Sequence, residues 1–147
     1  MRHRTVSDLV GTQVLVQLPP GAAVREAVRL MAERHIGAVL VTESGRLVGI
    51  FTERDMVNRV AAEGCNLDAT TLDSVMTKNP RTVEADSPAL SALRLMQLGH
   101  FRHLPVTRKG RLSGIVSLRD FAGNELAEVE REGDLGRAFA EGGRESG

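Results

Sequence analysis

The chain repeats itself. When the 147-residue sequence is shifted by 65 residues, positions 24–56 align with positions 89–121 without a gap. Fourteen of these 33 pairs are identical, whereas unrelated sequences would share about two. Two copies are fewer than a solenoid needs, so the repeat predicts a pseudo-symmetric pair of units in which each unit buries the open face of the other.

Each unit reads as the same series of elements. An extended piece comes first, and a helix with one apolar stripe at the spacing i, i+3, i+4, i+7 follows. Two β-rich runs then flank a short turn that contains glycine, which predicts a hairpin, and a last helix begins directly after it. This β-α-β-β-α order predicts an α+β fold. The extended pieces are 14–18 and 81–83, and the hairpin strands are 38–42 with 46–51 and 103–107 with 111–116.

Particular residues mark the ends of these helices. Ser87 and Pro88 predict an N-cap and a first helical position in the second unit, and Gly37 and Gly99 lie where the first helix of each unit should end. The predicted inner face of the last helix in the first unit is Met56, Val57, Val60 and Ala61. The predicted domains are 1–66 and 67–125, followed by an acidic extension, 126–147, that ends the last helix and is then disordered.

The composition narrows the class of function. The formal net charge is zero and the chain has no Trp or Tyr, so neither a broad basic surface nor an aromatic platform for nucleic acid is predicted. No apolar run approaches the roughly 20 residues that a membrane-spanning helix needs. Cys65 is the only cysteine, so no internal disulfide can form, and we expect a cytoplasmic protein without nucleic-acid or membrane partners.

A seven-residue motif ends each hairpin. It reads GIFTERD from Gly49 to Asp55 and GIVSLRD from Gly114 to Asp120. One interpretation is structural: a hydroxyl followed three residues later by Asp resembles a capping box, in which each side chain accepts from the backbone of the other residue. The motif then does no more than begin the last helix of each unit.

The other interpretation is a ligand site. A short carboxylate near a helix N-terminus can accept hydrogen bonds from the vicinal hydroxyls of a ribose, as acidic residues do in dinucleotide folds. Free N–H groups and a nearby arginine attract phosphate, and Gly49 and Gly114 would let a ligand approach the backbone closely. Hydroxyl, Asp, Gly and Arg together therefore suit a ribose phosphate.

Two long stretches resemble a pair of CBS domains, the regulatory modules named after cystathionine β-synthase. They are VREAVRLMAERHIGAVLVTESGRLVGIFTERDM and TLDSVMTKNPRTVEADSPALSALRLMQLGHFRHLPVTRKGRLSGIVSLRDF. The chain is similar to the stand-alone, two-domain bacterial members. The resemblance implies two β-α-β-β-α units packed sheet to sheet about a pseudo-twofold axis, with two equivalent clefts that in many members bind AMP, ADP or ATP, and in some NAD or S-adenosylmethionine.

The resemblance also implies which residues bind the ligand. The motif Asp would hold the ribose hydroxyls and the motif Ser or Thr would lie near ribose or phosphate, while the base would lie against the strand before the first helix and the start of the next strand. The second unit carries Lys78, Arg102 and His103 where the first has uncharged residues, so we expect the cleft that uses Asp120 to prefer a phosphate-bearing ligand. The predicted ligand-binding residues are Gln17, Gly37, Ala38, Val39, Thr52, Arg54, Asp55, Lys78, Thr82, Arg102, His103, Leu104, Ser117, Arg119 and Asp120.

Other classes of function are weighed against this sensor. An enzyme is not expected, because the chain has no His-Glu-x-x-His, Cys-x-x-Cys, Gly-x-Ser-x-Gly or Walker-type pattern. No metal site is predicted, since His35 and His100 end helices and are expected to cap them. The sequence thus predicts a non-catalytic, homodimeric sensor without an obligatory cofactor, and the alternative is a ligand-free dimeric adaptor that regulates an unidentified protein partner by direct binding.

Overall fold

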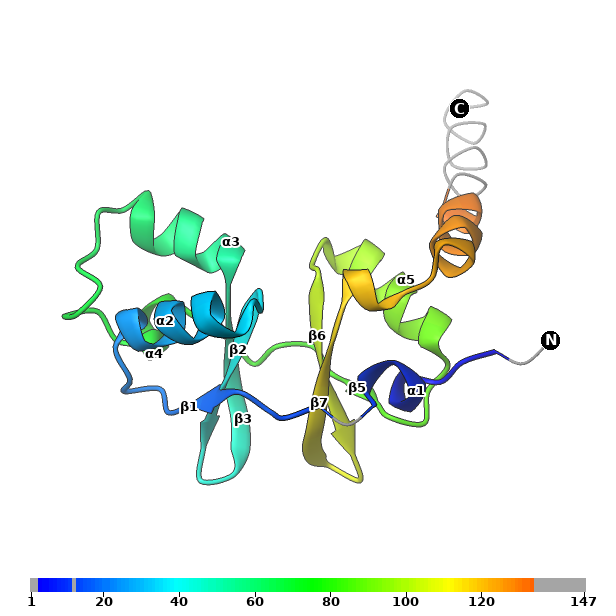
Figure 1. Ribbon diagram of the computed structural model, residues 1–147, viewed down its shortest axis with the longest axis horizontal. Helices are drawn as coiled ribbons and strands as arrows, with labels where there is room; N and C mark the ends of the chain where they lie inside the picture. The colour runs from blue at the N-terminus through cyan, green and yellow to red at the C-terminus, as the bar shows by residue number, and fades with distance from the viewer. Residues whose placement is uncertain (1–2, 12, 134–147) are drawn as a thin grey trace, which may run out of the picture.

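The protein consists of two similar halves whose β-sheets face each other, with helices on the outer faces (Figure 1). The computed structural model describes residues 3–11 and 13–133. The first half has a four-stranded sheet in the order β1-β2-β3-β4, and the second has a three-stranded sheet in the order β5-β6-β7. The predicted α+β pair of units, packed sheet to sheet, is therefore confirmed.

The elements follow the predicted order in both halves. The strands are β1 (Gln17–Leu18), β2 (Ala38–Glu43), β3 (Arg46–Thr52), β4 (Thr77–Lys78), β5 (Val83–Glu84), β6 (His103–Arg108) and β7 (Arg111–Ser117). The helices are α1 (Val6–Val10), α2 (Val24–Arg34), α3 (Glu53–Asp55), the π-helix η1 (Met56–Ala61), α4 (Leu72–Val75), α5 (Ala89–Gly99), the 3₁₀-helix η2 (Leu118–Asp120) and a C-terminal helix over 123–133.

Both predicted hairpins are present and share one turn geometry. The turn between β2 and β3 has positive φ angles of 51° at Ser44 and 78° at Gly45, and the turn between β6 and β7 has 52° at Lys109 and 78° at Gly110. Two consecutive residues with positive φ are typical of the type I′ turn, whose twist matches that of the flanking strands. Each sheet also has one parallel pair, because β1 joins β2 and β5 joins β6.

A small apolar cluster joins the two sheets. Ala38, Leu40 and Ile50 are buried there, and the side chains of Leu112 and Ile115 from the second half pack against them. In each half, the other face of the sheet is covered by helices and forms a larger core. The cluster between the sheets therefore brings the ends of the two hairpins, and the motifs that follow them, close to the pseudo-twofold axis.

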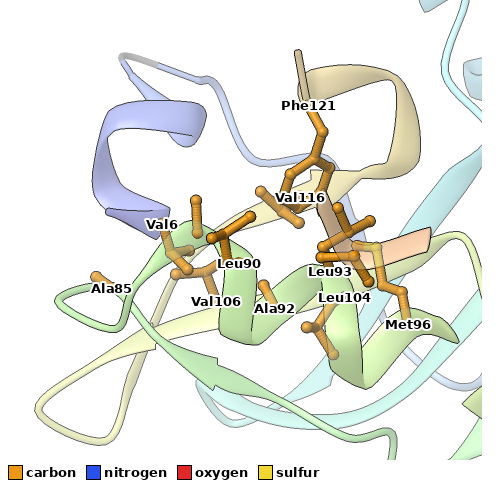
Figure 2. Packing of buried hydrophobic residues seen from close by; sticks show 12 residues of the cluster. Val6, Ala85, Leu90, Ala92, Leu93, Met96, Leu104, Val106, Val116 and Phe121 are labelled. Atoms are coloured by element: carbon orange, nitrogen blue, oxygen red, sulfur yellow. The ribbon is translucent and has the colours of Figure 1, made fainter. Parts of the chain in front are cut away.

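One short helix precedes each repeat, and each of these helices packs on the half that the other repeat forms. The α1 helix packs on the second half, where Val6 is fully buried beside Leu90 and Val106 (Figure 2). The α4 helix packs on the first half, where Leu72 is fully buried. Main-chain bonds hold both helices in place, since the Val6 N–H donates to Ser87 O and the Leu72 N–H donates to Ala22 O, each at 2.9 Å.

Two helix boundaries differ from the sequence-based prediction, whereas α5 ends at Gly99 as predicted. Pro88, and not Ser87, is the N-cap of α5, so the helix begins at Ala89. The helix of the first half ends before Gly37, because His35 takes the left-handed conformation at its C-cap, and His100 does the same in the second half. Both histidines therefore end the helices through their backbone, with φ near the value at which Gly is more usual.

The predicted inner face of the last helix in the first half is partly wrong. Val60 is fully buried, but Val57 is 61% exposed and Ala61 is exposed too. The cause is the π-helical winding of η1, in which the Ala62 N–H donates to Val57 O, five residues back. This i→i+5 bonding changes which residues share a face, and the sequence pattern had assumed the α-helical period.

The C-terminal extension is described only in part. Residues 123–133 form a helix whose Val129 is buried in the second core. Residues 134–147, for which disorder was predicted, lie outside the described residues.

Candidate functional site

The main cavity lies between the two halves and has a volume of about 870 Å³. Both hairpin motifs line it, as does the segment after β4 that connects the halves. Its lining residues are His35, Gly37, Ile50, Thr52, Glu53, Arg54, Asp55, Thr77, Asn79, Pro80, Arg81, Phe101, Arg102, His103, Ser117, Leu118, Arg119 and Leu126. The volume is in the range of small-molecule sites.

Asp55 is the buried carboxylate of this cavity, with 5% of its surface exposed. Its Oδ2 accepts from the Thr52 N–H at 3.0 Å and from the Thr52 hydroxyl at 3.1 Å, and its Oδ1 accepts from the Thr77 hydroxyl at 3.2 Å. Arg59 Nε lies 3.6 Å from Oδ1. These contacts orient the carboxylate, and Oδ1, with a single hydrogen-bond donor on it, retains acceptor capacity for a ligand hydroxyl.

The capping-box interpretation of the motif is confirmed in both halves. In the second half, the Ser117 N–H donates to Asp120 Oδ2 at 2.7 Å and the Ser117 hydroxyl donates to the same atom at 3.1 Å. The structural and the ligand-binding interpretations do not compete, because capping engages Oδ2, while Oδ1 of Asp55 accepts from the Thr77 hydroxyl and keeps capacity for a second donor. The cap therefore positions each carboxylate rather than consuming it.

The structure groups the positive charges differently from the sequence-based prediction. Arg102 and His103 had been placed with Asp120, but they line the same cavity as Asp55, and Asp120 does not line it. The segment after β4 lines this cavity too, through Asn79, Pro80 and Arg81, because β4 pairs with β3 of the first half. Lys78 is exposed in β4 opposite Gly49 and is not among the lining residues.

His103 lines the cavity and lies beside Gly37 of the other half. A Cβ atom placed on Gly37 would meet His103 Nε2 at 2.9 Å and Glu53 Oε1 at 2.8 Å, so a larger residue there would require these side chains to shift. Burial lowers the pKa of the His103 imidazole below its usual value; Arg119 and Arg102 act in the same direction, while Glu53 and Asp120 oppose them. The ring is therefore held neutral at a pH where an exposed histidine would begin to take up a proton.

This pKa shift predicts how stability depends on pH. A histidine with a lowered folded-state pKa binds fewer protons than the unfolded chain, so its contribution is complete above the usual pKa of about 6.5 and is lost as the pH falls towards the folded-state value. We expect the free energy of unfolding to fall more between about pH 7.5 and about pH 5.5 in the wild type than in His103→Gln. Urea unfolding at both pH values measures this, with His100→Gln as the matched control; equal losses in the wild type and His103→Gln would contradict the prediction.

The sequence had suggested that Gly49 and Gly114 give a ligand access to the backbone, but in the structure they do not. A Cβ atom on Gly49 would lie 2.4 Å from Met76 Sδ, and one on Gly114 would lie 2.5 Å from Val10 Cγ1. The space beside each glycine is therefore filled by the last side chain of the exchanged segment, α4 in one half and α1 in the other. These glycines serve packing between the motif strand and the short helix.

The remaining predicted site residues lie outside the main cavity. Thr82 lines a second, smaller cavity of about 360 Å³ near the hairpin turns. Gln17 is exposed in β1, and Ala38, Val39 and Leu104 are buried in the strands that follow α2 and α5. The cavity instead uses Thr77, Asn79 and Phe101, among others, which were not predicted. The repeat could have indicated Thr77, because the residue 65 positions earlier, at position 12, is also a threonine.

The two motifs differ in what lies beside them. In the first half, β4 completes the sheet next to the motif strand. In the second half, the Gln13 side chain takes this place: its Nε2 donates to Ile115 O at 2.9 Å and its Oε1 accepts from the Ile115 N–H at 3.1 Å. The position equivalent to Arg59 is Asn124, and the arginine near Asp120 is instead Arg4, which donates to the Asp120 carbonyl oxygen at 3.3 Å. The repeated motif is therefore set in two unequal surroundings.

Two searches of the described residues bear on other classes of site. In residues 3–11 and 13–133, no group of three or more His, Cys, Asp or Glu side chains is arranged to hold a metal ion. Over the same residues, every helix is too short or too polar to cross a membrane.

The fold is a pair of similar α+β modules, each with one motif that faces a shared cavity. The model of one such family, described as "CBS domain", matches residues 6–62 and 72–125. The chain therefore belongs to the CBS-domain family and carries a tandem pair of these domains.

Relatives and solved structures agree with this assignment. The chain is 39% identical over 139 residues to the CBS domain-containing protein CBSCBSPB3 of Arabidopsis thaliana, covering 94% of this chain but only 25% of the relative; it thus spans about a quarter of that protein. It is 32% identical to YhcV, a CBS domain-containing protein of Bacillus subtilis, covering 84% of this chain and 86% of the relative.

Among solved structures, the CBS domain protein PAE2072 of Pyrobaculum aerophilum, complexed with AMP, is 29% identical with a TM-score of 0.77, over 87% of this chain and 99% of that one. The CBS-domain containing protein ATU1752 of Agrobacterium tumefaciens is 37% identical with a TM-score of 0.74, over 80% of this chain and 95% of that one.

Proposed function

We propose that this protein is a non-catalytic sensor that binds an adenosine-containing ligand between its two halves. AMP, ADP and ATP are the first candidates, followed by NAD(H) and S-adenosylmethionine. The observation that carries the proposal is Asp55, a buried carboxylate oriented by Thr52 and Thr77 in the wall of a cavity that also holds four arginines. A carboxylate that can accept from vicinal hydroxyls, next to donors for phosphate, is suited to a ribose phosphate.

The proposed ligand would bind with its ribose at Asp55 and its phosphate towards the arginines. The AMP complex of the related PAE2072 protein supports this class of ligand. Because the cavity walls come from both halves, a bound ligand would favour one relative arrangement of the halves, and a partner protein would respond to that shift in population. We place the protein in the cytoplasm and propose that it acts as a homodimer.

A panel of ligands tests the proposal on the whole chain. We expect AMP, ADP or ATP to bind in isothermal titration calorimetry and to raise the unfolding temperature, with NADH and S-adenosylmethionine as further members of the panel. A ligand at 100 times its dissociation constant adds about 2.7 kcal/mol of stability. If folded protein responds to none of them, the ligand-free adaptor becomes the better account; turnover of a nucleotide by pure protein would contradict the non-catalytic role.

A further inference from the structure

The turn between β6 and β7 concentrates positive charge. Arg108, Lys109 and Arg111 lie in it or beside it, and all three are exposed. The equivalent residues at the turn between β2 and β3 are Glu43, Ser44 and Arg46. Three cations in the second copy therefore correspond to one cation and one anion in the first, although the two turns have the same backbone geometry.

This charge pattern is unfavourable for the hairpin itself. Arg108 and Arg111 face each other directly across the two strands, and like charges in such a pair destabilise a sheet. The equivalent pair in the first half, Glu43 and Arg46, has opposite charges. Lys109 takes a left-handed turn position, with a φ of 52°, where Asn, Asp or Gly is usual. Folding alone therefore does not account for the cations of this turn.

The rest of the protein does not neutralise these cations. Within residues 3–11 and 13–133, the ion pairs involve none of the basic residues at the two turns. Arg108 donates to the Ser7 hydroxyl at 3.0 Å, which is a neutral partner. The acidic residues of the two hairpins and β5 are Glu43 and Glu84, and Glu84 accepts from the Thr107 hydroxyl at 2.6 Å. The surface at the turns therefore keeps an excess of positive charge.

Both hairpin turns border the smaller cavity of about 360 Å³, because the two hairpins point to the same end of the molecule (Figure 1). Leu47 and Leu112, which are equivalent in the repeat, form its apolar part and are only partly buried. Arg46 lines the cavity as well, and Thr82 and Thr107 add hydroxyl groups. An apolar pocket with a polar, charged rim is typical of a surface that binds another protein.

The smaller cavity also touches the connection between the halves. Asn79 and Pro80 line both this cavity and the main cavity. The Asn79 N–H donates to Val48 O at 3.2 Å, which ties the connection to β3. A molecule seated between the hairpin turns would therefore contact residues that also form the wall of the main cavity.

We propose that the two hairpin turns and the smaller cavity between them form a docking surface for an acidic segment of a partner protein, with one apolar side chain of that segment in the cavity. The excess of cations selects an acidic segment by charge complementarity. The two leucines favour a peptide over nucleic acid, because none of the described residues that line the cavity offers an aromatic ring for a base to stack on. The inference rests on the proposed function in one respect: the partner is the protein that responds to the ligand.

A short peptide of sequence Glu-Glu-Leu-Glu-Glu, with blocked ends, probes this surface on the whole chain. In an NMR titration of the amide signals, we expect it to bind and to shift the amides of residues 45–47 and 110–112. The peptide Glu-Glu-Gln-Glu-Glu should bind about tenfold more weakly, because it lacks the apolar side chain. The affinity should also fall as the salt concentration rises, since exposed charges are screened.

The repeat supplies a matched variant. Arg108→Glu with Lys109→Ser copies the first turn into the second and should weaken peptide binding by at least about tenfold. The first half shows that this sequence forms the same turn, so the variant should fold, and its urea midpoint should rise because the like-charge pair is removed. The control, Arg29→Glu with Arg34→Ser, makes the same change in net charge on the exposed surface of α2 and should bind the peptide as the wild type does.

The outcomes separate this inference from the proposed function. If AMP binds but the peptide leaves the amides of the turns unshifted, the sensor is supported and the docking surface is overturned. If the peptide binds at the turns and no adenosine compound binds, the docking surface is supported and the proposed ligand is overturned. Equal peptide affinity in the copied-turn variant and the α2 control would overturn the docking surface, as would a thymidine oligonucleotide of similar charge that binds there more tightly than the peptide.

Discussion

Leu72→Ala is expected to lower the free energy of unfolding by about 2–5 kcal/mol, the range for a large-to-small change in a well-packed core. Leu72 belongs by sequence to the second repeat, yet its side chain is fully buried in the core of the first half, with Val24, Phe51 and Val60. The surrounding sheet and helices cannot close the resulting space completely, so the loss includes a cavity cost as well as the lost transfer energy.

Leu98→Ala is the matched control, because Leu98 is a leucine of the second repeat that is 81% exposed. Its change in urea unfolding should stay within about 0.5 kcal/mol. Native-state hydrogen exchange tests which half the substitution destabilises. In Leu72→Ala, the protection of amides from exchange should fall first in β2 of the first half. A loss of protection confined to β6 would mean that α4 supports its own repeat, contrary to the exchange of short helices.

The repeat made most of the architecture predictable. Identical spacing in the two copies placed both hairpins, and the glycines at 45 and 110 marked turns whose positive φ angles the structure then showed. The sheet-to-sheet arrangement followed from the resemblance rather than from local propensity. Sequence periodicity worked where the α-helical period applied, as in α2, and failed in η1, because nothing in the sequence announces i→i+5 bonding.

The exchange of short helices could not be predicted from the repeat. A shift of 65 residues relates α4 to α1 but does not say which half either helix covers, since both halves offer similar faces. The half on which α4 packs determines part of the lining of the cavity. Because α4 lies on the first half, β4 pairs with β3, and Thr77 and the connecting segment lie near Asp55. The sequence therefore named the motif residues, but it did not show that Arg102 and His103 line the same cavity as Asp55.

The glycines of the motif also show that the sequence alone does not reveal which segments pack together. Gly49 and Gly114 were expected to let a ligand approach the backbone closely, but the sequence does not show which group makes the approach. The structure fills it with Met76 and Val10, residues of the exchanged segments and not a ligand. A repeated glycine thus predicts a close approach, and only the tertiary arrangement identifies the group that approaches.

Asp55→Asn is expected to weaken AMP binding by about 10- to 100-fold, the equivalent of losing a hydrogen bond to a charged group. The substitution keeps the shape of the side chain and one carbonyl oxygen, but it replaces a charged acceptor with an amide donor. Asp120→Asn is the matched change in the other capping box; because Asp120 does not line the main cavity, we expect it to weaken AMP binding less than about threefold.

Calorimetric titration of both variants, with their unfolding temperatures, separates binding from folding. Asparagine accepts fewer hydrogen bonds than a carboxylate, so both variants should lose some stability through the weakened cap, by about 1 kcal/mol. Thr77→Val removes the third hydroxyl or N–H partner of Asp55 without changing its charge and should have an intermediate effect on AMP. If both Asp variants lose stability but bind AMP normally, the motif is only a helix cap; if Asp120→Asn has the larger effect on binding, the phosphate-preferring cleft lies on the other side of the pseudo-twofold axis, as the sequence alone had indicated.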